Sequence, residues 1–421
     1  MSARELGRII RDEGWRPSSL LRWPAWLREQ GLRDALLIGG LYLLWLVVAY
    51  AINLIVTGAH TPQQLFDQWV RFDGIYFRAL AEYGYAEASR LVRYQQGFAF
   101  LTAFFPLFPL LIHLAAPLFA LNYSAASVVV PQVLTWFALV ALFRLIALDF
   151  SRRVAWLTLF ALMLFPTSYF LLAPYSETLF LLLVVVTFYF YRQRRFLPAG
   201  IAGVLVSATR IMGPLVCGAL LLALARRWWQ QTLGVVSMPR QGPTSRSLRT
   251  LLGEFPDLPF IVLMPLGMLV YMAYLWLVFG DPLLFLRAHA SSEWRVSISL
   301  LGPIKSLGLP FYNLLARDWT SAAFRMNLFD SAFFYAGIAL AVYGWRRIPF
   351  SYSLYALLVL FVPTFDGTLI STPRYLLISF PLFLSSALFL DTHPHARWLL
   401  IPLGLCSLAG TVLYFQTVFL G

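Results

Sequence analysis

The sequence predicts an all-α polytopic membrane protein. Apolar residues make up 60% of its 421 positions and aromatic residues 17%, whereas soluble proteins average under half apolar residues. Many apolar runs reach roughly 18–25 residues, the length that crosses a bilayer as a helix. These runs are continuous and do not alternate apolar with polar residues, so membrane strands are not expected.

The net charge of +13 is also explained by membrane topology. In a soluble protein this charge would suggest nucleic-acid binding. Here most Arg residues stand at the ends of apolar runs, as the positive-inside rule requires of cytoplasmic loops. We therefore expect membrane lipids, and no nucleic acid, among the partners.

The chain divides into two parts. Residues 1–33 are polar and Arg-rich and include Trp15, Trp23 and Trp26, a composition typical of a cytoplasmic segment at the membrane interface. Residues 34–421 contain no Gly/Ser linker, low-complexity tract or convincing repeat. We expect them to form a single transmembrane domain.

The first span, at residues 35–56, is expected to run outward because the Arg cluster before it stays inside. Residues 57–97 then form the start of a large extracytoplasmic loop, loop 1. Residues 98–121 contain three Pro, which weaken a straight helix. If they crossed the membrane, "DFSRR" (149–153) would fall outside. We therefore expect residues 98–121 not to cross.

Eleven spans are expected in all, with the N-terminus cytoplasmic and the C-terminus extracytoplasmic. A second large outer loop covers about 280–327. "TRIMGP" (209–214) divides one long apolar stretch into two short helices that meet at an outer turn. The spans after the first are expected at 125–148, 154–172, 178–191, two within 197–225, 258–279, 328–343, 350–363, 376–390 and 399–419.

Unusual polar residues gather at the outer ends of the spans. Carboxylates and Arg side chains close to hydrocarbon are functional candidates, because burying an ion needs compensation. The candidates are Asp73, Glu82, Glu177, Arg210, Asp281, Asp366 and Arg374. The five His residues are scattered, and Cys217 and Cys406 lie inside apolar runs, so we expect neither a metal site nor a disulfide framework.

Each candidate has a structural and a functional interpretation. Asp73 in "RFDGIYFRALAEYGY" (71–85) is either the N-cap of an amphipathic helix or a general base at the membrane boundary, and composition alone favours the cap. Glu177 suits the first turn of a helix. Arg374 either snorkels or holds a phosphate. Arg210 interrupts an apolar stretch and is harder to explain structurally.

Six segments, in order, resemble a known family. Residues 73–85 resemble the "WDG…Y…IA…GY" signature of the PIG-V-like mannosyltransferases, which add the second mannose of glycosylphosphatidylinositol anchors, and of their bacterial relatives. "FFPLFPLL" is similar to their "FFPLYP", "YSETLF" to "YSESLF" and "ATRIMG" to "TR..G". Two later segments, "GDPLLFLRAHASSEW" and "PRYLLISFPLF", also match. The resemblance covers roughly residues 65–385, and Phe72 stands where the family usually has Trp.

The resemblance implies a GT-C glycosyltransferase, a multi-span enzyme of the plasma membrane, here of a bacterium, that uses a lipid-phosphate sugar. It implies transfer of a hexose, most naturally mannose, from a polyprenyl-phosphate donor to a hydroxyl of a lipid or glycan acceptor on the extracytoplasmic face, with inversion. Asp73 would be the base and Glu177 a second acid. Arg374 and Arg210 would hold the donor phosphate. No metal or cofactor is expected.

Further substrate contacts are expected from side chains in the same outer segments. These are Tyr76, Glu82, Tyr175, Asp281, Arg287, Trp294 and Tyr375. The alternative is a polytopic transporter or lipid flippase without transferase activity, since broken helices and intramembrane Arg also occur there. Transporters usually show paired, repeat-related broken segments, and the sequence contains none. A catalytically inactive scaffold stays open.

Overall fold

The computed structural model describes residues 25–91, 98–232, 255–291, 299–316 and 322–418. Helices make up 81% of the structure, and every regular element in these ranges is a helix. The predicted all-α class is confirmed.

The first half of the chain contributes eleven of these elements. They are α2 (Ala25–Thr57), α3 (Pro62–Trp69), α4 (Asp73–Leu91), η1 (Phe98–Ala103), α5 (Leu107–Ala115), η2 (Ala116–Phe119), α6 (Tyr123–Asp149), α7 (Arg152–Met163), η3 (Ser168–Leu171), α8 (Glu177–Arg192) and α9 (Phe196–Ser207). The remaining elements are α10 (Pro214–Thr232), α12 (Leu258–Leu263), α13 (Leu266–Phe279), α14 (Leu284–Ser291), α15 (Gly302–Ala316), α16 (Ala322–Gly344), α17 (Phe350–Phe361), η4 (Val362–Asp366), α18 (Thr372–Leu377), α19 (Phe380–Thr392), η5 (Pro394–Leu399) and α20 (Leu400–Phe415).

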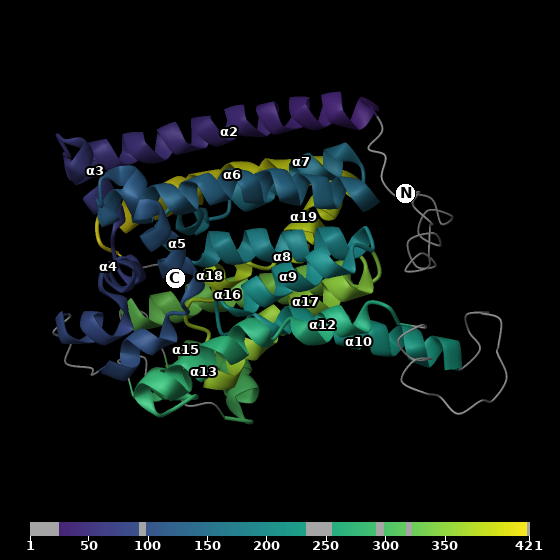
Figure 1. Ribbon diagram of the computed structural model, residues 1–421. Coiled ribbons are helices and arrows are strands. Elements are labelled where there is room, and N and C mark those ends of the chain that lie inside the picture. Colours follow the sequence, from purple (N-terminus) through teal and green to yellow (C-terminus); the bar gives the residue numbers. More distant parts are fainter. Residues whose placement is uncertain (1–24, 92–97, 233–254, 292–298, 317–321, 419–421) are drawn as a thin grey trace.

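The long helices lie side by side with their axes nearly parallel (Figure 1). Helix α6 packs on α7 and α8, α8 packs on α9, and α7 packs on α19. Large apolar side chains such as Phe170, Phe180 and Phe188 are fully buried between them. Helix α2 covers one edge of this bundle and contacts α6 and α20.

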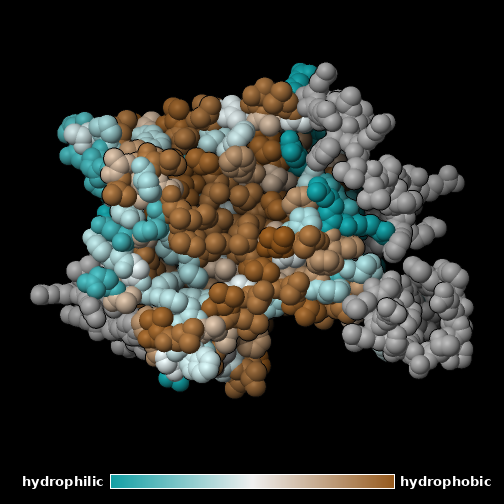
Figure 2. Space-filling model, in the orientation of Figure 1, coloured by the Kyte–Doolittle hydropathy of each residue, from teal (hydrophilic) through white to brown (hydrophobic). Residues whose placement is uncertain are grey.

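The face of the molecule seen in Figure 2 is apolar over its middle and more polar toward its two ends. On α2, Leu43, Leu44 and Val47 are about 60% exposed. Because lipid tails are as apolar as these side chains, an exposed apolar belt of this kind is what a helical membrane protein presents to a bilayer.

Five helical segments are long and apolar enough to cross a membrane. They are Gly31–Thr57, Tyr123–Asp149, Leu258–Phe279, Met326–Gly344 and Pro394–Phe415. Each coincides with a predicted span. At the other predicted spans, α7, α8, α9, α17 and α19 have 12 to 16 residues. Helix α10 has 19 residues but is not among the five segments that are long and apolar enough. The predicted number of eleven therefore rests on the sequence alone.

Two details of the predicted segmentation can be compared directly. Residues 98–121 are divided among η1, α5 and η2, and the nine residues of α5 extend only about 14 Å along its axis. The stretch 197–225 breaks at 208–213 into α9 and α10, as predicted from "TRIMGP". The segment predicted to lie at the interface, residues 1–33, is described only in part. Helix α2 begins within it, at Ala25. Residues 1–24, with Trp15 and Trp23, lie outside the described residues.

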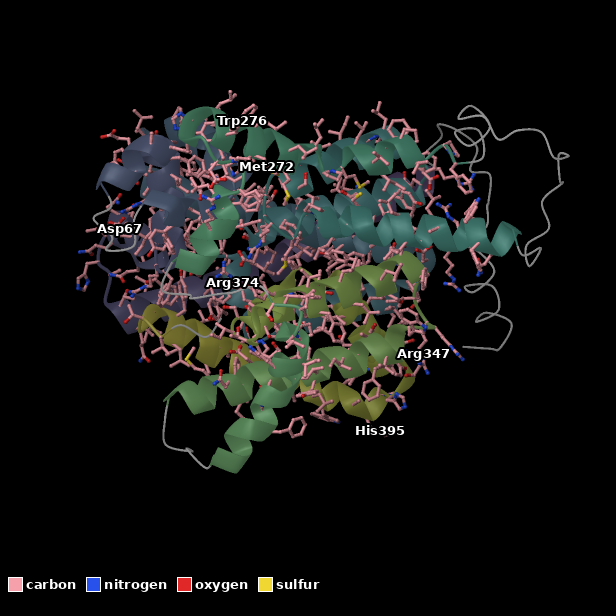
Figure 3. The ribbon with its side chains drawn as sticks, turned by 90° about the horizontal axis from the view of Figure 1, so that it is seen from below. Asp67, Met272, Trp276, Arg347, Arg374 and His395 are labelled. Atoms are coloured by element: carbon pink, nitrogen blue, oxygen red, sulfur yellow. The ribbon has the colours of Figure 1, made fainter. Side chains whose placement is uncertain are left out.

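The Arg clusters gather at one end of the bundle. Ion pairs join Arg152 to Asp34, Arg153 to Asp391, and Arg192 to Asp149. These pairs link the start of α7 to α2 and α19, and the ends of α6 and α8 to each other. In Figure 3, Arg347 and His395 lie toward one end of the bundle and Asp67 toward the opposite end, with Arg374 between them. Short loops between antiparallel helices therefore bring Arg residues that are far apart in the sequence to one end.

The two ends of α6 offer a test of orientation. Single cysteines at Asn122 and at Ser151, in a background that lacks Cys217 and Cys406, are treated with a membrane-impermeant thiol reagent on intact cells. We expect the reagent to label position 122 and not position 151, because the Arg-rich end should face the cytoplasm. Permeabilised cells should label both. Labelling of position 151 from outside would reverse the orientation of α6.

Candidate active site

The site begins at the turn between α3 and α4. The carbonyl oxygen of Arg71 accepts a hydrogen bond from the backbone N–H of Gly74 at 2.9 Å. Phe72 has a φ of 50°, a left-handed conformation that is uncommon for a bulky residue and tends to persist at functional sites. The turn ends at Asp73, the first residue of α4, where the helix N-terminus favours a negative charge.

Gly74 brings this turn into direct contact with the segment before α8. A Cβ atom on Gly74 would lie only 2.6 Å from Cγ of Pro174, so no larger residue fits without a shift. Next to this contact, the hydroxyl of Tyr175 donates a hydrogen bond to the carbonyl oxygen of Arg71 at 3.4 Å. The "DG" and "PYSE" motifs therefore hold each other in place.

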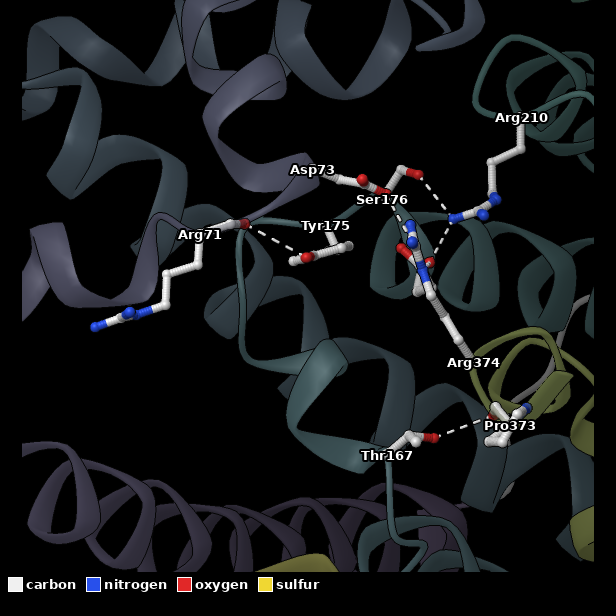
Figure 4. Close-up of polar contacts among 9 residues, drawn as sticks. Arg71, Asp73, Thr167, Tyr175, Ser176, Arg210, Pro373 and Arg374 are labelled. Atoms are coloured by element: carbon white, nitrogen blue, oxygen red, sulfur yellow. Dashed lines mark hydrogen bonds and ion pairs between the residues drawn. The ribbon is translucent and has the colours of Figure 1, made fainter. Parts of the chain in front are cut away.

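Four charged side chains meet beside this contact, and we call Asp73, Glu177, Arg210 and Arg374 the charge cluster (Figure 4). Nη1 of Arg374 lies 2.6 Å from Oδ2 of Asp73. Nε of Arg374 donates to Oε1 of Glu177. Nη1 of Arg210 lies 2.7 Å from the same oxygen. Two carboxylates and two guanidiniums thus neutralise each other at the starts of α4 and α8, the α9–α10 turn and α18.

Aromatic rings and a neighbouring backbone contact position Arg374. Its guanidinium lies 4.7 Å from the ring centre of Tyr175 and 5.4 Å from that of Phe170, within the range of cation–π attraction. The hydroxyl of Thr167 donates to the carbonyl oxygen of Pro373 at 3.1 Å and holds the start of α18. The rings therefore position the guanidinium of Arg374, and the hydrogen bond from Thr167 positions the backbone next to it.

The two carboxylates of the charge cluster differ in accessibility. The side chain of Glu177 is 1% exposed and that of Asp73 is 17% exposed. Burial alone would raise the pKa of Glu177, but Arg210 and Arg374 outweigh burial and lower it. Burial would lower the pKa of Arg374, yet Glu177 and Asp73 raise it well above its usual value. Glu177 and Arg374 therefore stabilise each other in their charged forms. Asp73 is the more accessible carboxylate of the cluster for a ligand.

An open hollow of about 510 Å³ adjoins the α3–α4 turn, within the size range of small-molecule sites. Tyr76 borders it, and its ring packs against Phe100 and Phe104 at centroid distances of 4.9 and 5.1 Å. The other polar residues on its wall are Asp67, Gln68, Arg71 and Thr417. A second hollow, beside Tyr375, has only about 10 Å³, room for at most one water molecule.

The predicted site residues therefore fall into two groups. Asp73, Glu177, Arg210, Arg374 and Tyr175 are brought together, Tyr375 adjoins them on α18, and Tyr76 lies one turn along α4. Among the described residues, Glu82, Asp281 and Arg287 form no ion pair with this cluster. Asp366 stands at the end of η4, where its carboxylate accepts from the backbone N–H of Thr368 at 2.7 Å.

Glu82 lies more than two turns further along α4. Asp281 and Arg287 form their own ion pair at 3.0 Å near the start of α14, and the side chain of Arg287 is 74% exposed. Trp294 lies outside the described residues. Within the described ranges, no three His, Cys, Asp or Glu side chains converge on a position that could hold a metal ion.

Two residues of the site were not predicted from the sequence. Ser176 accepts a hydrogen bond from Nη1 of Arg210 at 3.0 Å. Arg71 supplies the backbone oxygen that anchors Tyr175, and its side chain borders the hollow. Both residues lie inside the motifs quoted above. Their nearness in sequence to Asp73 and Glu177 is the feature from which they could have been predicted.

Comparison with known protein families, curated proteins and solved structures finds no match to this chain. The fold and the charge cluster together define a helical membrane protein with a buried acid–arginine site between its helices. The family resemblance is therefore carried by the motifs alone.

The close approach of Gly74 to Pro174 can be tested by adding one methyl group. Gly74→Ala should lower the unfolding temperature of the purified protein in detergent, because overpacking typically costs about 1–3 kcal/mol. Gly40→Ala is the matched control, since a Cβ there would meet nothing within 4 Å. If Gly74→Ala unfolds at the same temperature as the control, the contact between the two motifs is not as close as described.

Proposed function

We propose that this protein is an integral-membrane glycosyltransferase of the GT-C type, similar to the PIG-V-like mannosyltransferases. It moves a hexose, mannose by the motif resemblance, from a polyprenyl phosphate to a hydroxyl of a lipid or glycan acceptor. The observation that carries this proposal is the pairing of the partly accessible Asp73 with the buried Arg374. Asp73 directly follows Arg71 and Phe72, which line the hollow. The proposal includes eleven spans, a plasma-membrane location and an extracytoplasmic site.

Asp73 serves as the general base of the transfer. Arg374 binds Oδ2 of its carboxylate, which leaves Oδ1 to accept the proton of the acceptor hydroxyl. As this proton moves, the acceptor oxygen forms a bond to the anomeric carbon. The bond from that carbon to the phosphate oxygen breaks, and its electron pair leaves with the phosphate. One displacement through an oxocarbenium-like state inverts the anomeric centre.

Glu177 serves as a positioning residue in this mechanism. Its Oε1 binds both Arg374 and Arg210, and its side chain is only 1% exposed, so it is far less accessible to a substrate than Asp73. Through Arg374 it fixes the orientation of Asp73. Orientation of this kind contributes to catalysis because reacting groups must be held in near-attack geometry.

The rival function is transport or lipid flipping. The break between α9 and α10 beside Arg210 is a feature that transporters also use near their substrate sites. A transporter needs no general base, whereas the transferase depends on Asp73. Sugar transfer in proteoliposomes without a solute gradient therefore distinguishes the two functions.

Asp73→Asn should abolish most of the transfer, because the amide keeps the shape of the side chain and removes the base. We expect a loss of roughly 10²–10⁴-fold in transfer of radiolabelled mannose from polyprenyl-phosphate mannose to a membrane extract. Asp391→Asn, at the opposite end of the bundle, is the matched control and should be near wild type.

Two results would contradict the proposal. Near-wild-type turnover by Asp73→Asn would remove Asp73 as the base. Transfer from GDP-mannose in the absence of any lipid carrier would overturn the donor, since the proposal requires a lipid-linked sugar.

A further inference from the structure

Arg71 borders the hollow and has no carboxylate partner among the described residues. Its Nε donates to the carbonyl oxygen of Gln68 at 2.8 Å, and its Nη2 donates to the side-chain oxygen of Gln68. Its side chain points away from Asp73 and Arg374 (Figure 4). Arg374 and Arg210, in contrast, are each bound to at least one carboxylate.

The hollow that Arg71 borders has the composition of a site for a phosphorylated sugar. Arg71 offers a guanidinium that Gln68 holds in place, a good partner for phosphate oxygens. Phe72 and Tyr76 supply aromatic walls. Asp67, on the exposed rim, has its carboxylate bound to Gln63 at 3.0 and 3.1 Å and is suited to accept from a sugar hydroxyl.

The geometry of an inverting displacement also favours Arg71 over Arg374 as the phosphate ligand. The base and the leaving group must lie on opposite sides of the anomeric carbon, and in inverting glycoside hydrolysis the two catalytic groups stand roughly 6.5–9.5 Å apart. Arg374 contacts Asp73 itself, so a phosphate bound there would lie beside the base. The strained turn at Phe72 directs Arg71 to the other side.

We propose that Arg71 binds the phosphate of a polyprenyl-phosphate ligand in the hollow between the α3–α4 turn and the end of α20. This assignment rests on the proposed function in one respect: the proposed function identifies the bound phosphate as that of the sugar donor. It gives the two arginines different roles. Arg71 holds the phosphate that departs with the electron pair of the broken bond, and Arg374 orients the base.

The test measures binding separately from transfer. A polyprenyl monophosphate is titrated into the purified full-length protein, and the dissociation constant is read from tryptophan fluorescence. Arg71→Gln should bind about tenfold more weakly or worse, because a charge-assisted hydrogen-bonded contact is lost. Gln68→Ala should give a smaller loss in the same direction and serves if Arg71→Gln does not fold. Arg153→Gln, at the opposite end of the bundle, should bind like the wild type.

Two further measurements ask which part of the ligand is recognised and whether Arg374 binds the phosphate in place of Arg71. A water-soluble hexose 1-phosphate should compete with the lipid, and more weakly in Arg71→Gln, if the phosphate group itself is recognised. Unchanged lipid binding in both Arg71→Gln and Gln68→Ala overturns the assignment. The assignment is also overturned if Asp73→Asn tightens lipid binding while Arg71→Gln has no effect. Asp73→Asn frees Nη1 of Arg374, so this result would identify Arg374 as the phosphate ligand.

The outcomes separate this site from the proposed function. A wild-type protein that binds polyprenyl phosphate through Arg71 but transfers no hexose contradicts the glycosyltransferase and supports the site. The opposite result is also informative. If the wild type transfers hexose and Arg71→Gln equals it in lipid binding and in donor KM, the glycosyltransferase is supported and the Arg71 site is contradicted.

Discussion

The buried carboxylate of Glu177 is the interaction on which the site depends. A single oxygen of this side chain binds guanidinium groups from two other elements, and the side chain is 1% exposed. An ion in this position is stable only while its partners remain, and removing one partner of a buried pair typically costs about 3–5 kcal/mol. The start of α8, the α9–α10 turn and α18 are therefore held together by one charge.

The second constraint is the contact that brings Asp73 to this charge. Gly74 against Pro174 places the start of α4 on the segment before α8, and Tyr175 binds the backbone of Arg71. The turn then presents Asp73 to Arg374 on one side and Arg71 to the hollow on the other. One short segment thus separates the proposed base from the proposed phosphate ligand, an arrangement that suits a displacement reaction.

The sequence allowed the helical class and the main site residues to be predicted, because both depend on local signals. Continuous apolar runs indicate helices, and charged residues at their outer ends indicate functional positions. Asp73, Glu177, Arg210 and Arg374 were all predicted in this way. Their pairing could not be predicted, because Arg374 and Glu177 are 197 residues apart in the chain and no sequence pattern connects them.

The same limit explains what was missed or left unconfirmed. Arg374 and Arg210 were predicted as phosphate ligands. In the structure carboxylates bind both, and phosphate binding by either arginine stays a prediction. Five segments have the length of full spans. Most helices at the other predicted spans are shorter. Helices α17 and α19, for example, each end two residues before a proline, and hydropathy alone does not show where a helix stops.

The central claim is that the charge cluster acts as one unit, and a double-mutant cycle between Asp73 and Arg210 tests it most directly. No direct contact joins these two residues in the described structure; they are linked only through Glu177 and Arg374. The unfolding free energies of Asp73→Asn, Arg210→Gln and the double variant are measured in detergent. The account predicts a coupling energy of about 0.5 kcal/mol or more, as for residues within one ion-pair network. Additive effects would contradict it.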